Sequence, residues 1–513
     1  MVCPICRSPD IEMTTVSKMG LAYKLSLTCS ECKKEVWSKY TSPRVDLENT
    51  KRFDINARTV LASKECGINF SNLEKFFSIL NTPPPMNHKT YNTISLEVRD
   101  AAVNSSVECM KACANLISDR YKSGEYLNDQ SCSSPHPVVI VSSDGTWQKR
   151  GHSSHNGVGA LIEINSGFVI DAEVVSNFCR ECNSAPAADS QDYVAWREKH
   201  LPMCKKNFNG SANAMEMEAA GIMFSRSEAE RGLVYGTMLC DGDSKALKRV
   251  NDLDLYGDLV VVKEDCINHI SKRMHTALTK LKQSNKAQLN YKFTQDNIEK
   301  LSNTYATNLK KAAPDIEKMR KAVLSGFFHS ISSDEEPNHV FCPEGPDSWC
   351  KFQRAKFANV APPPHKPDFS AEVGRLVYPI FQRLSEPELL QRCSRMATQN
   401  ANESFNALIW KRAPKTEFSS LPSVQTATAL AVLAFNAGPV GLKPVMERLG
   451  LHWNKASEVY GLQTISKKFR IMKNKVKGLS KWKRKNLQRQ RRIKEDRQKN
   501  LEGETYSAGL MDN

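Results

Sequence analysis

The chain has 513 residues, of which 40% are hydrophobic and 25% are charged. These values are typical of a globular protein, and the length predicts two to four domains. We find no apolar run of transmembrane length and no signal peptide, so we expect neither a membrane protein nor a secreted one.

The positive charge is concentrated in one basic tail. The formal net charge is +16, and residues 461–500 hold 16 lysine and arginine residues against two acidic ones, an excess of 14 that leaves +2 for the rest. Basic clusters of this kind bind phosphate backbones or act as nuclear import signals, so we expect a nuclear protein. The tail is either a basic helix or a disordered arm. Its candidate DNA contacts are Lys481, Lys483, Arg484, Lys485, Arg491 and Arg492.

Residues 1–40 contain two cysteine pairs that predict a structural zinc site. Cys3 and Cys6 form one Cys-x-x-Cys pair, and Cys29 and Cys32 form the other. Four thiolates from two tight turns complete a tetrahedral zinc shell, and so small a module has too little core to fold without the metal. The spacing resembles a zinc ribbon, with one strand expected near residues 21–28. We therefore interpret the 16 cysteines mainly as reduced thiols.

Residues 50–130 are expected to form a helical region. Apolar residues recur at helical spacing from Phe70 to Leu80 and again from Tyr91 to Tyr121. Cys109 and Cys113 lie on the second apolar stripe, where core packing is the favoured interpretation. A polar segment, residues 127–136, predicts a linker.

The next stretch predicts a strand that ends in an acidic residue. The β-branched run that starts at Val138 leads into Asp144 and Gly145, which on their own are also typical of a simple turn. Two more strands are expected at 157–164 and 168–175, joined by a glycine-containing hairpin turn. The three strands would form an antiparallel meander with Asp144 at one end.

A second apolar strand also ends in acids. A helix is expected at 213–231, then a strand at 233–239 that leads into Asp241 and Asp243, and a short strand at 259–262. This order matches the start of an RNase H-like fold, in which a mixed sheet is flanked by helices. The third acid of that fold lies on a later helix, and Glu403 is the best candidate. We therefore predict an α/β core formed by residues 137–262 and 393–440.

Three such carboxylates suit phosphodiester chemistry. Two Mg²⁺ (or Mn²⁺) ions about 3.5–4 Å apart can activate an oxygen nucleophile and stabilise the leaving oxygen, and Mg²⁺ prefers oxygen ligands. In this interpretation Asp144 is shared by both ions, Asp241 binds one, and Glu403 completes the other. Asp243 remains the alternative for the second acid.

Three motifs together resemble those of Mutator-like transposases over roughly residues 50–440. They are the segment from Ser143 to His152, the segment from Asp241 to Lys245, and the segment from Gln399 to Asn406. The resemblance implies catalytic acids at Asp144, Asp241 and Glu403. It also implies metal-dependent cutting of DNA at element ends and joining of those ends to a target, with a homo-oligomer as a candidate assembly.

Further cysteine and histidine sets fit the same family. A Cys-x-x-His often follows the second acid in related transposases, and Cys266 and His269 occupy that place, either as zinc ligands or as buried polar groups. Two four-residue sets have spacings suited to structural zinc. The first lies in an expected insertion, residues 176–210, and comprises Cys179, Cys182, His200 and Cys204. The second comprises His329, His339, Cys342 and Cys350.

Residues 263–392 are interpreted as a mostly helical, basic insertion between the second and third acids. The favoured hypothesis is an active nuclear DNA transposase. The alternative is a domesticated, non-catalytic, zinc-dependent DNA-binding protein derived from one, although all three acids are present. A nuclease of RNA/DNA hybrids would explain the acids but not the zinc modules.

Overall fold

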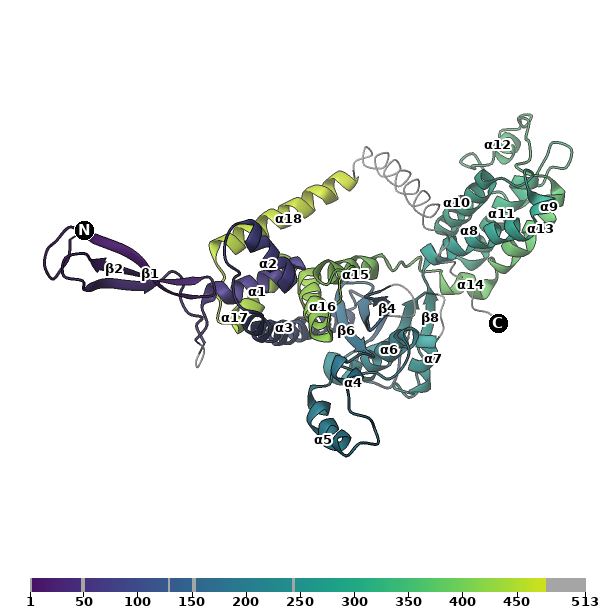
Figure 1. Ribbon diagram of the computed structural model, residues 1–513. Helices are drawn as coiled ribbons and strands as arrows, with labels where there is room; N and C mark the ends of the chain where they lie inside the picture. Colours follow the sequence, from purple (N-terminus) through teal and green to yellow (C-terminus); the bar gives the residue numbers. More distant parts are fainter. Residues whose placement is uncertain (1, 48–50, 128–129, 150–153, 242–244, 477–513) are drawn as a thin grey trace.

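The structure is a computed structural model that describes residues 2–47, 51–127, 130–149, 154–241 and 245–476. Figure 1 shows a small N-terminal sheet at one end, a group of helices at the other, and a mixed α/β core between them. Within the described ranges, no helix combines the length and the apolar character needed to cross a membrane.

The N-terminal module is an antiparallel sheet of three strands, more than the single strand predicted. Its strands, in the order β1-β2-β3, are β1 (Ile11–Met19), β2 (Ala22–Cys29) and β3 (Glu35–Tyr40). The β1–β2 turn contains Gly20 at a φ of +66°. The side chain of Asn56 donates to the backbone oxygen of Met19 and accepts from the backbone nitrogen of Leu21. This contact ties the turn to the first helix.

The helices of residues 54–122 share one apolar core with helices from the C-terminal part of the chain. They are α1 (Asp54–Cys66), α2 (Phe70–Ile79) and α3 (His88–Lys122), and their C-terminal partners are α16 (Leu421–Asn436) and α17 (Lys443–Arg448). Val98 of α3 and Leu430 of α16 belong to this core. The stripe predicted on α3 is only partly buried, because Leu116 is 42% exposed. The helices of residues 54–122 thus pack with α16 and α17 in one shared apolar core.

The central sheet has five strands in the order β6-β5-β4-β7-β8. They are β4 (Val138–Trp147), β5 (Asn156–Glu163), β6 (Val169–Ser176), β7 (Val234–Cys240) and β8 (Val262–Asp265). The β4–β5 and β5–β6 pairs are antiparallel, whereas β4–β7 and β7–β8 are parallel. The predicted meander is present, and the fold is of the α/β class.

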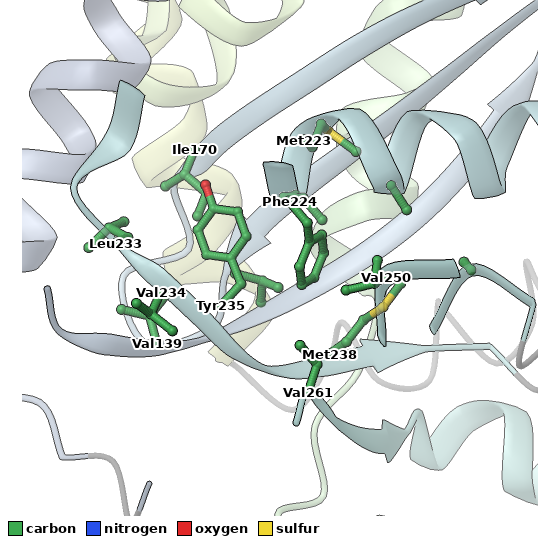
Figure 2. Close-up of a cluster of buried hydrophobic side chains, with 14 of the residues drawn as sticks. Val139, Ile170, Met223, Phe224, Leu233, Val234, Tyr235, Met238, Val250 and Val261 are labelled. Carbon is green, nitrogen blue, oxygen red and sulfur yellow. The ribbon is translucent and has the colours of Figure 1, made fainter. Parts of the chain in front are cut away.

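Helices cover both faces of this sheet. Figure 2 shows one face, where Met223 and Phe224 of α6 (Met215–Ser225) and Val250 of α7 (Lys245–Asp252) pack on β4 and β7. On the other face, side chains of α15 (Asn400–Arg412) and α16 pack on β5 and β6. A β-carbon added to Gly159 would lie 2.6 Å from that of Ala219, so α6 approaches β5 closely.

Two predicted strand boundaries are wrong, and one predicted helix is interrupted. β4 does not end at Asp144, because its antiparallel pairing with β5 continues through Trp147 opposite Gly157. β8 lies at Val262–Asp265 rather than 259–262, because pairing with β7 selects the polar residues while Val260 is 68% exposed. The predicted helix 213–231 breaks after Ser225 into a π-helical turn that ends at Gly232, where φ is +62°.

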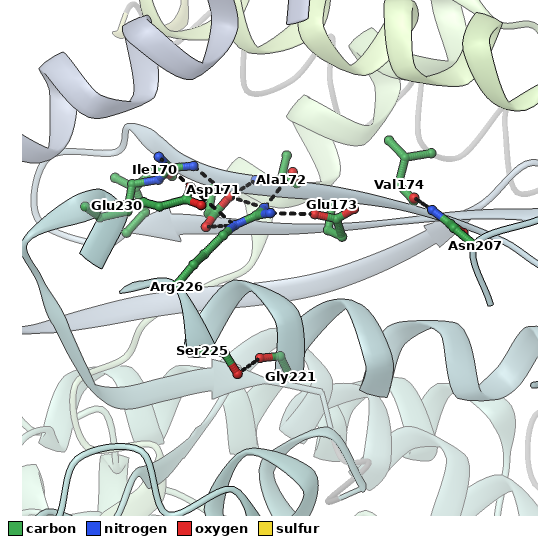
Figure 3. Close-up of polar contacts among 11 residues, drawn as sticks. Ile170, Asp171, Ala172, Glu173, Val174, Asn207, Gly221, Ser225, Arg226 and Glu230 are labelled. Atoms are coloured by element: carbon green, nitrogen blue, oxygen red, sulfur yellow. Dashed lines mark hydrogen bonds and ion pairs between the residues drawn. The ribbon is translucent and has the colours of Figure 1, made fainter. Parts of the chain in front are cut away.

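A buried ion-pair network involves β6, the outer strand of the sheet (Figure 3). Arg226 donates two hydrogen bonds to the carboxylate of Asp171, which is fully buried, and a third to Glu173 at 2.7 Å. Arg231 donates to the same carboxylate of Asp171 at 3.1 Å. A buried carboxylate is tolerated when it is paired in this way.

The segment between the second and third acids forms a helical unit with its own core. Its helices are α8 (Ile267–Ser284), α9 (Lys286–Leu289), α10 (Gln295–Ala312), α11 (Ile316–Ile331), α12 (Lys351–Phe357), α13 (Ala371–Arg383) and α14 (Pro387–Arg392). Buried Phe293, Tyr305, Phe327 and Phe381 contribute to its core. We call this unit the helical insertion. After it, the chain returns to the sheet through α15.

Candidate catalytic and metal sites

The first two predicted acids emerge from neighbouring parallel strands. β4 and β7 pair in register up to Ser142 opposite Leu239. Counting two residues further along each chain segment leads to Asp144 and to Asp241, which directly follows the last residue of β7. Neighbouring strands are about 4.8 Å apart, so the two carboxylates leave adjacent backbone positions. Asp144 is half-buried, and the side chain of Asp241 is 56% exposed.

Helix α15 lies across β4 and is held there by a row of polar side chains. The hydrogen bonds run from Gln399 Nε2 to Ser143 O (2.8 Å), Asn402 Nδ2 to Ser142 O (3.2 Å), Asn406 Nδ2 to Asp144 Oδ2 (2.8 Å) and Trp410 Nε1 to Thr146 Oγ1 (2.8 Å). The four donors are three or four residues apart and therefore share one helix face. Glu403 adjoins this face in the first turn and is exposed.

Asp241 and Glu403 are both close enough to Asp144 to affect its carboxylate electrostatically. Burial is the main cause that raises the pKa of Asp144 to about 6, the hydrogen bond from Asn406 opposes it, and the charges of Asp241 and Glu403 raise it further. Like charges disfavour ionisation only at short range. The structure therefore brings these three residues into one neighbourhood. Among the described residues, however, the clusters with all ligand atoms within 4.8 Å consist of cysteine and histidine.

The donor set at Asp144 fits a divalent metal in its chemistry. Carboxylate oxygens suit Mg²⁺ or Mn²⁺. Beside Asp144, Oδ1 of Asn406 is buried and has no hydrogen-bond partner within the described part of the chain. A buried acceptor without a donor indicates a missing group. A cation here would also offset the burial and the like-charge repulsion that raise the pKa of Asp144.

His269 lies at the second acid rather than in a zinc cluster. Its Nδ1 is 3.0 Å from Oδ1 of Asp241. Cys266 is buried immediately before the first turn of α8. Neither residue belongs to a metal-ligand cluster found among the described residues. Asp243, the alternative second acid, lies outside the described residues, as do the tail residues predicted to contact DNA: Lys481, Lys483, Arg484, Lys485, Arg491 and Arg492.

One acid near the site was missed by the sequence interpretation. Glu216 is half-buried in the first turn of α6. A β-carbon added to Gly145 would lie 2.9 Å from Cδ of Glu216, so this carboxylate lies against β4 at the residue that follows Asp144. An acidic residue in the first turn of a helix is common, and the sequence carried no other signal for it.

The N-terminal cysteines form a compact four-sulfur group. Sγ of Cys3 is 3.6 Å from that of Cys32, and Sγ of Cys6 is 3.4 Å from that of Cys29. All four sulfur atoms lie within 4.8 Å of one another. With zinc–sulfur distances of about 2.3 Å, sulfur atoms at the corners of a tetrahedron are about 3.8 Å apart. The group could therefore hold zinc with little movement.

The second set lies in the segment that follows β6. Cys179 precedes α4 (Arg180–Asn183), Cys182 lies within that helix, and His200 ends α5 (Gln191–His200). Nε2 of His200 is 3.1 Å from Sγ of Cys182, which is 3.5 Å from Sγ of Cys204. These residues, far apart in sequence, meet in a segment with few buried side chains of its own. They could hold a structural metal.

The third set gathers at the end of α11 in the helical insertion. Nδ1 of His329 is 3.2 Å from Nδ1 of His339, and Sγ of Cys350 is 3.6 Å from that same atom of His339. Cys342 completes the group. Burial lowers the pKa of His329 to about 4, which keeps its imidazole neutral as a metal ligand must be. Two neutral ring nitrogens facing each other are suited to a shared cation.

The comparisons with known proteins identify the family. The model of the Mutator-like transposase family matches residues 2–350. This range covers more than half of the chain, so the protein belongs to the Mutator-like transposases, as the motifs predicted. A search of the curated proteins found no match.

Family membership implies nuclease or transferase activity on DNA, generally dependent on metal. The matched range includes the N-terminal cysteines, Asp144 and Asp241 but ends before Glu403. The assignment of the third acid therefore depends on the contacts of α15.

Proposed function

We propose that this protein is a DNA transposase with an RNase H-like catalytic core, in which Asp144, Asp241 and Glu403 form the catalytic acidic triad. The observation that carries the proposal is the convergence of three distant segments. β4 and β7 place two acids on adjacent parallel strands, and α15 crosses β4 beside them. The strand order β6-β5-β4-β7-β8, with three antiparallel strands followed by two parallel ones, supports the fold assignment.

The chain's own residues orient the acids. Asn406 donates to Asp144 and fixes its carboxylate, while Gln399 and Asn402 hold the start of α15 and with it Glu403. His269 contacts Asp241 from the first turn of α8. A divalent metal bound by the acids would activate the attacking oxygen and stabilise the leaving oxygen of the phosphodiester. The carboxylates would position that metal against the DNA strand.

The other parts of the chain have supporting roles in this proposal. The three cysteine and histidine clusters bind structural zinc, because four protein ligands leave no open position for a substrate. The basic tail binds DNA and directs the protein to the nucleus.

The test is cleavage and strand transfer of DNA that carries the terminal repeats flanking the protein's own coding region. With Mg²⁺ or Mn²⁺, the wild type should cut at the repeat ends. The variants Asp144→Asn, Asp241→Asn and Glu403→Gln should each lose the activity while still binding DNA. Asp252→Asn, an exposed acid of α7, serves as the control and should keep the activity.

Two outcomes would change the proposal. Cleavage that survives Asp241→Asn but not Asp243→Asn would transfer the second role to Asp243. A wild-type protein that binds its ends but does not cut them would be a domesticated DNA-binding protein.

A further inference from the structure

A groove leads from the candidate catalytic site into the helical insertion. It has a volume of about 610 Å³ and lies between α8 on one side and the end of α13 with α14 on the other. Asp241 and His269 line the groove at the catalytic site. The same cavity therefore contacts one of the proposed catalytic acids and the insertion.

Basic side chains dominate the lining of this groove. Five of them take part: Lys272, Arg273, Lys280, Arg383 and Arg392. The acidic residues of the lining are Asp241 and Glu386. The groove thus has an excess of positive charge, and it lies beside the site where the negatively charged DNA substrate is expected.

The five cations fall into two groups with different surroundings. Arg273 and Arg392 are ion-paired with the buried carboxylate of Asp265, at 3.4 and 2.8 Å. Lys272, Lys280 and Arg383 are exposed, and within the described residues no ion pair is found for any of them. The first group has a protein partner that stabilises the fold, whereas the second group has charge available for a ligand.

The spacing of the α8 residues suits an extended anion. His269, Lys272, Thr276 and Lys280 are three or four residues apart and share one helix face along the groove. The eleven helical steps from His269 to Lys280 span about 16 Å at 1.5 Å per residue. One strand of B-DNA advances about 3.4 Å per nucleotide, so this face is as long as about five nucleotides.

We propose that this groove binds the phosphate backbone of the DNA strand that continues from the bond cut at the catalytic acids. We call Lys272, Lys280 and Arg383 the groove cations. The proposal rests on the proposed function, because the groove begins at Asp241 and its occupant must be continuous with the substrate there. An isolated small anion would fill only part of a groove of this length. An acidic peptide would not connect to a scissile phosphodiester.

The experiment measures DNA affinity as a function of salt in the full-length chain. The groove variant combines Lys272→Ala, Lys280→Ala and Arg383→Ala, and the background is Asp144→Asn so that binding is separated from cutting. The probe is a duplex that carries the terminal repeat and extends on both sides of the cleavage position. A protein that neutralises Z phosphates of duplex DNA gives a slope of log K against log salt of about −0.9 Z.

Loss of three phosphate contacts should make that slope shallower by about 2 to 3. The control variant combines Lys310→Ala, Lys311→Ala and Lys321→Ala, which are exposed on α10 and α11 and change the net charge equally. It should leave the slope at the wild-type value. The comparison therefore separates the effect of the groove cations from the effects of the basic tail and of the overall net charge. Equal slopes for the groove variant and the control variant would overturn the proposal.

A second measurement locates the contact. Shortening the probe to fewer than about five nucleotides beyond the cleavage position on the groove side should weaken wild-type binding but leave the groove variant unaffected. If both proteins respond equally to shortening, the groove does not hold that strand.

The two proposals fail separately. If the wild type cuts DNA but the groove variant has the control slope, the groove assignment is wrong and the catalytic one stands. If the wild type does not cut although the groove variant has the shallower slope, the groove holds DNA and the catalytic proposal fails.

Discussion

One buried amide among the side chains that hold α15 on β4 belongs to Asn402, and replacing this residue with alanine should both destabilise the protein and reduce its activity. Asn402 has no exposed surface. Its Oδ1 accepts a hydrogen bond from the hydroxyl of Ser142 at 2.6 Å, and its Nδ2 donates to the backbone oxygens of Ser142 and Ala160 at 3.2 and 3.4 Å. The amide thus connects the helix to β4 and β5 at once.

The expected magnitude follows from these contacts. In Asn402→Ala the hydroxyl of Ser142 stays buried without its acceptor, which costs about 1–3 kcal/mol. The lost side-chain volume leaves a small cavity that adds about 1 kcal/mol. We therefore expect the free energy of unfolding to fall by about 2–4 kcal/mol. Because Glu403 is the next residue, a shift of the helix start by about 1 Å should lower the cleavage rate about 100-fold.

Denaturant unfolding and single-turnover cleavage of repeat-end DNA measure the two effects. Ser404→Ala is the matched control, because its exposed hydroxyl bonds only within the helix, to the backbone oxygen of Asn400. It should change the unfolding free energy by less than about 0.5 kcal/mol. If Asn402→Ala matches this control in both stability and rate, Asn402 does not hold α15 on β4 and the account of the third acid is refuted.

Four further predictions concern metal, charge and packing. Elemental analysis of the purified chain should find three zinc ions, and Cys29→Ser should remove one of them because a four-sulfur shell loses a ligand; three ions in that variant would contradict the assignment. His339→Ala should likewise lose one ion and lower the unfolding temperature of the helical insertion, whereas an unchanged zinc content would exclude this residue as a ligand. Burial would raise the pKa of Asp265, but the hydrogen bond from Arg392 and nearby cations lower it below its usual value. Its stabilising contribution is therefore present above about pH 4 and lost as the pH falls through the folded-state pKa. Asp265→Asn should cost about 2 kcal/mol at pH 7, a figure reduced for the partial exposure of its partners; in urea titrations the difference from wild type should shrink below pH 4, and a constant difference would refute the ion-pair account. Gly159→Ala should destabilise the core by about 1–3 kcal/mol, because its new methyl group would overlap Ala219, and an unchanged unfolding midpoint would mean that α6 can move away freely.

Local sequence patterns predicted many elements of the fold. The apolar runs that start at Val138 and Val234 have buried first halves because helices cover both faces of the sheet. A continuous β-branched run predicts a strand that is buried in this way. Helical spacing located α3 and α8 because each needs an apolar face. The cysteine and histidine sets were also visible, since ligand types that are rare elsewhere recur at short spacing.

Local sequence patterns could not predict which distant segments contact one another. Asp144 and Gly145 have the composition of a turn, yet β5 supplies hydrogen bonds that extend the strand past them. Asp265 belongs to a strand because Arg392, more than a hundred residues away, compensates its charge. Glu216 lies beside Gly145 only because α6 packs against β4. None of these causes is contained within a local window of sequence.

The candidate catalytic site is assembled from both sides of the helical insertion, and this has a consequence for biosynthesis. After β8 ends at Asp265, about 135 more residues must be made before α15 begins at Asn400. At about 5–20 residues per second this takes roughly 7–27 s. During that interval the apolar face of β5 and β6 lacks the cover that α15 and α16 later provide. A growing chain would thus carry two of the acids without the third, and the proposed DNA-cutting activity would arise only after α15 has been made.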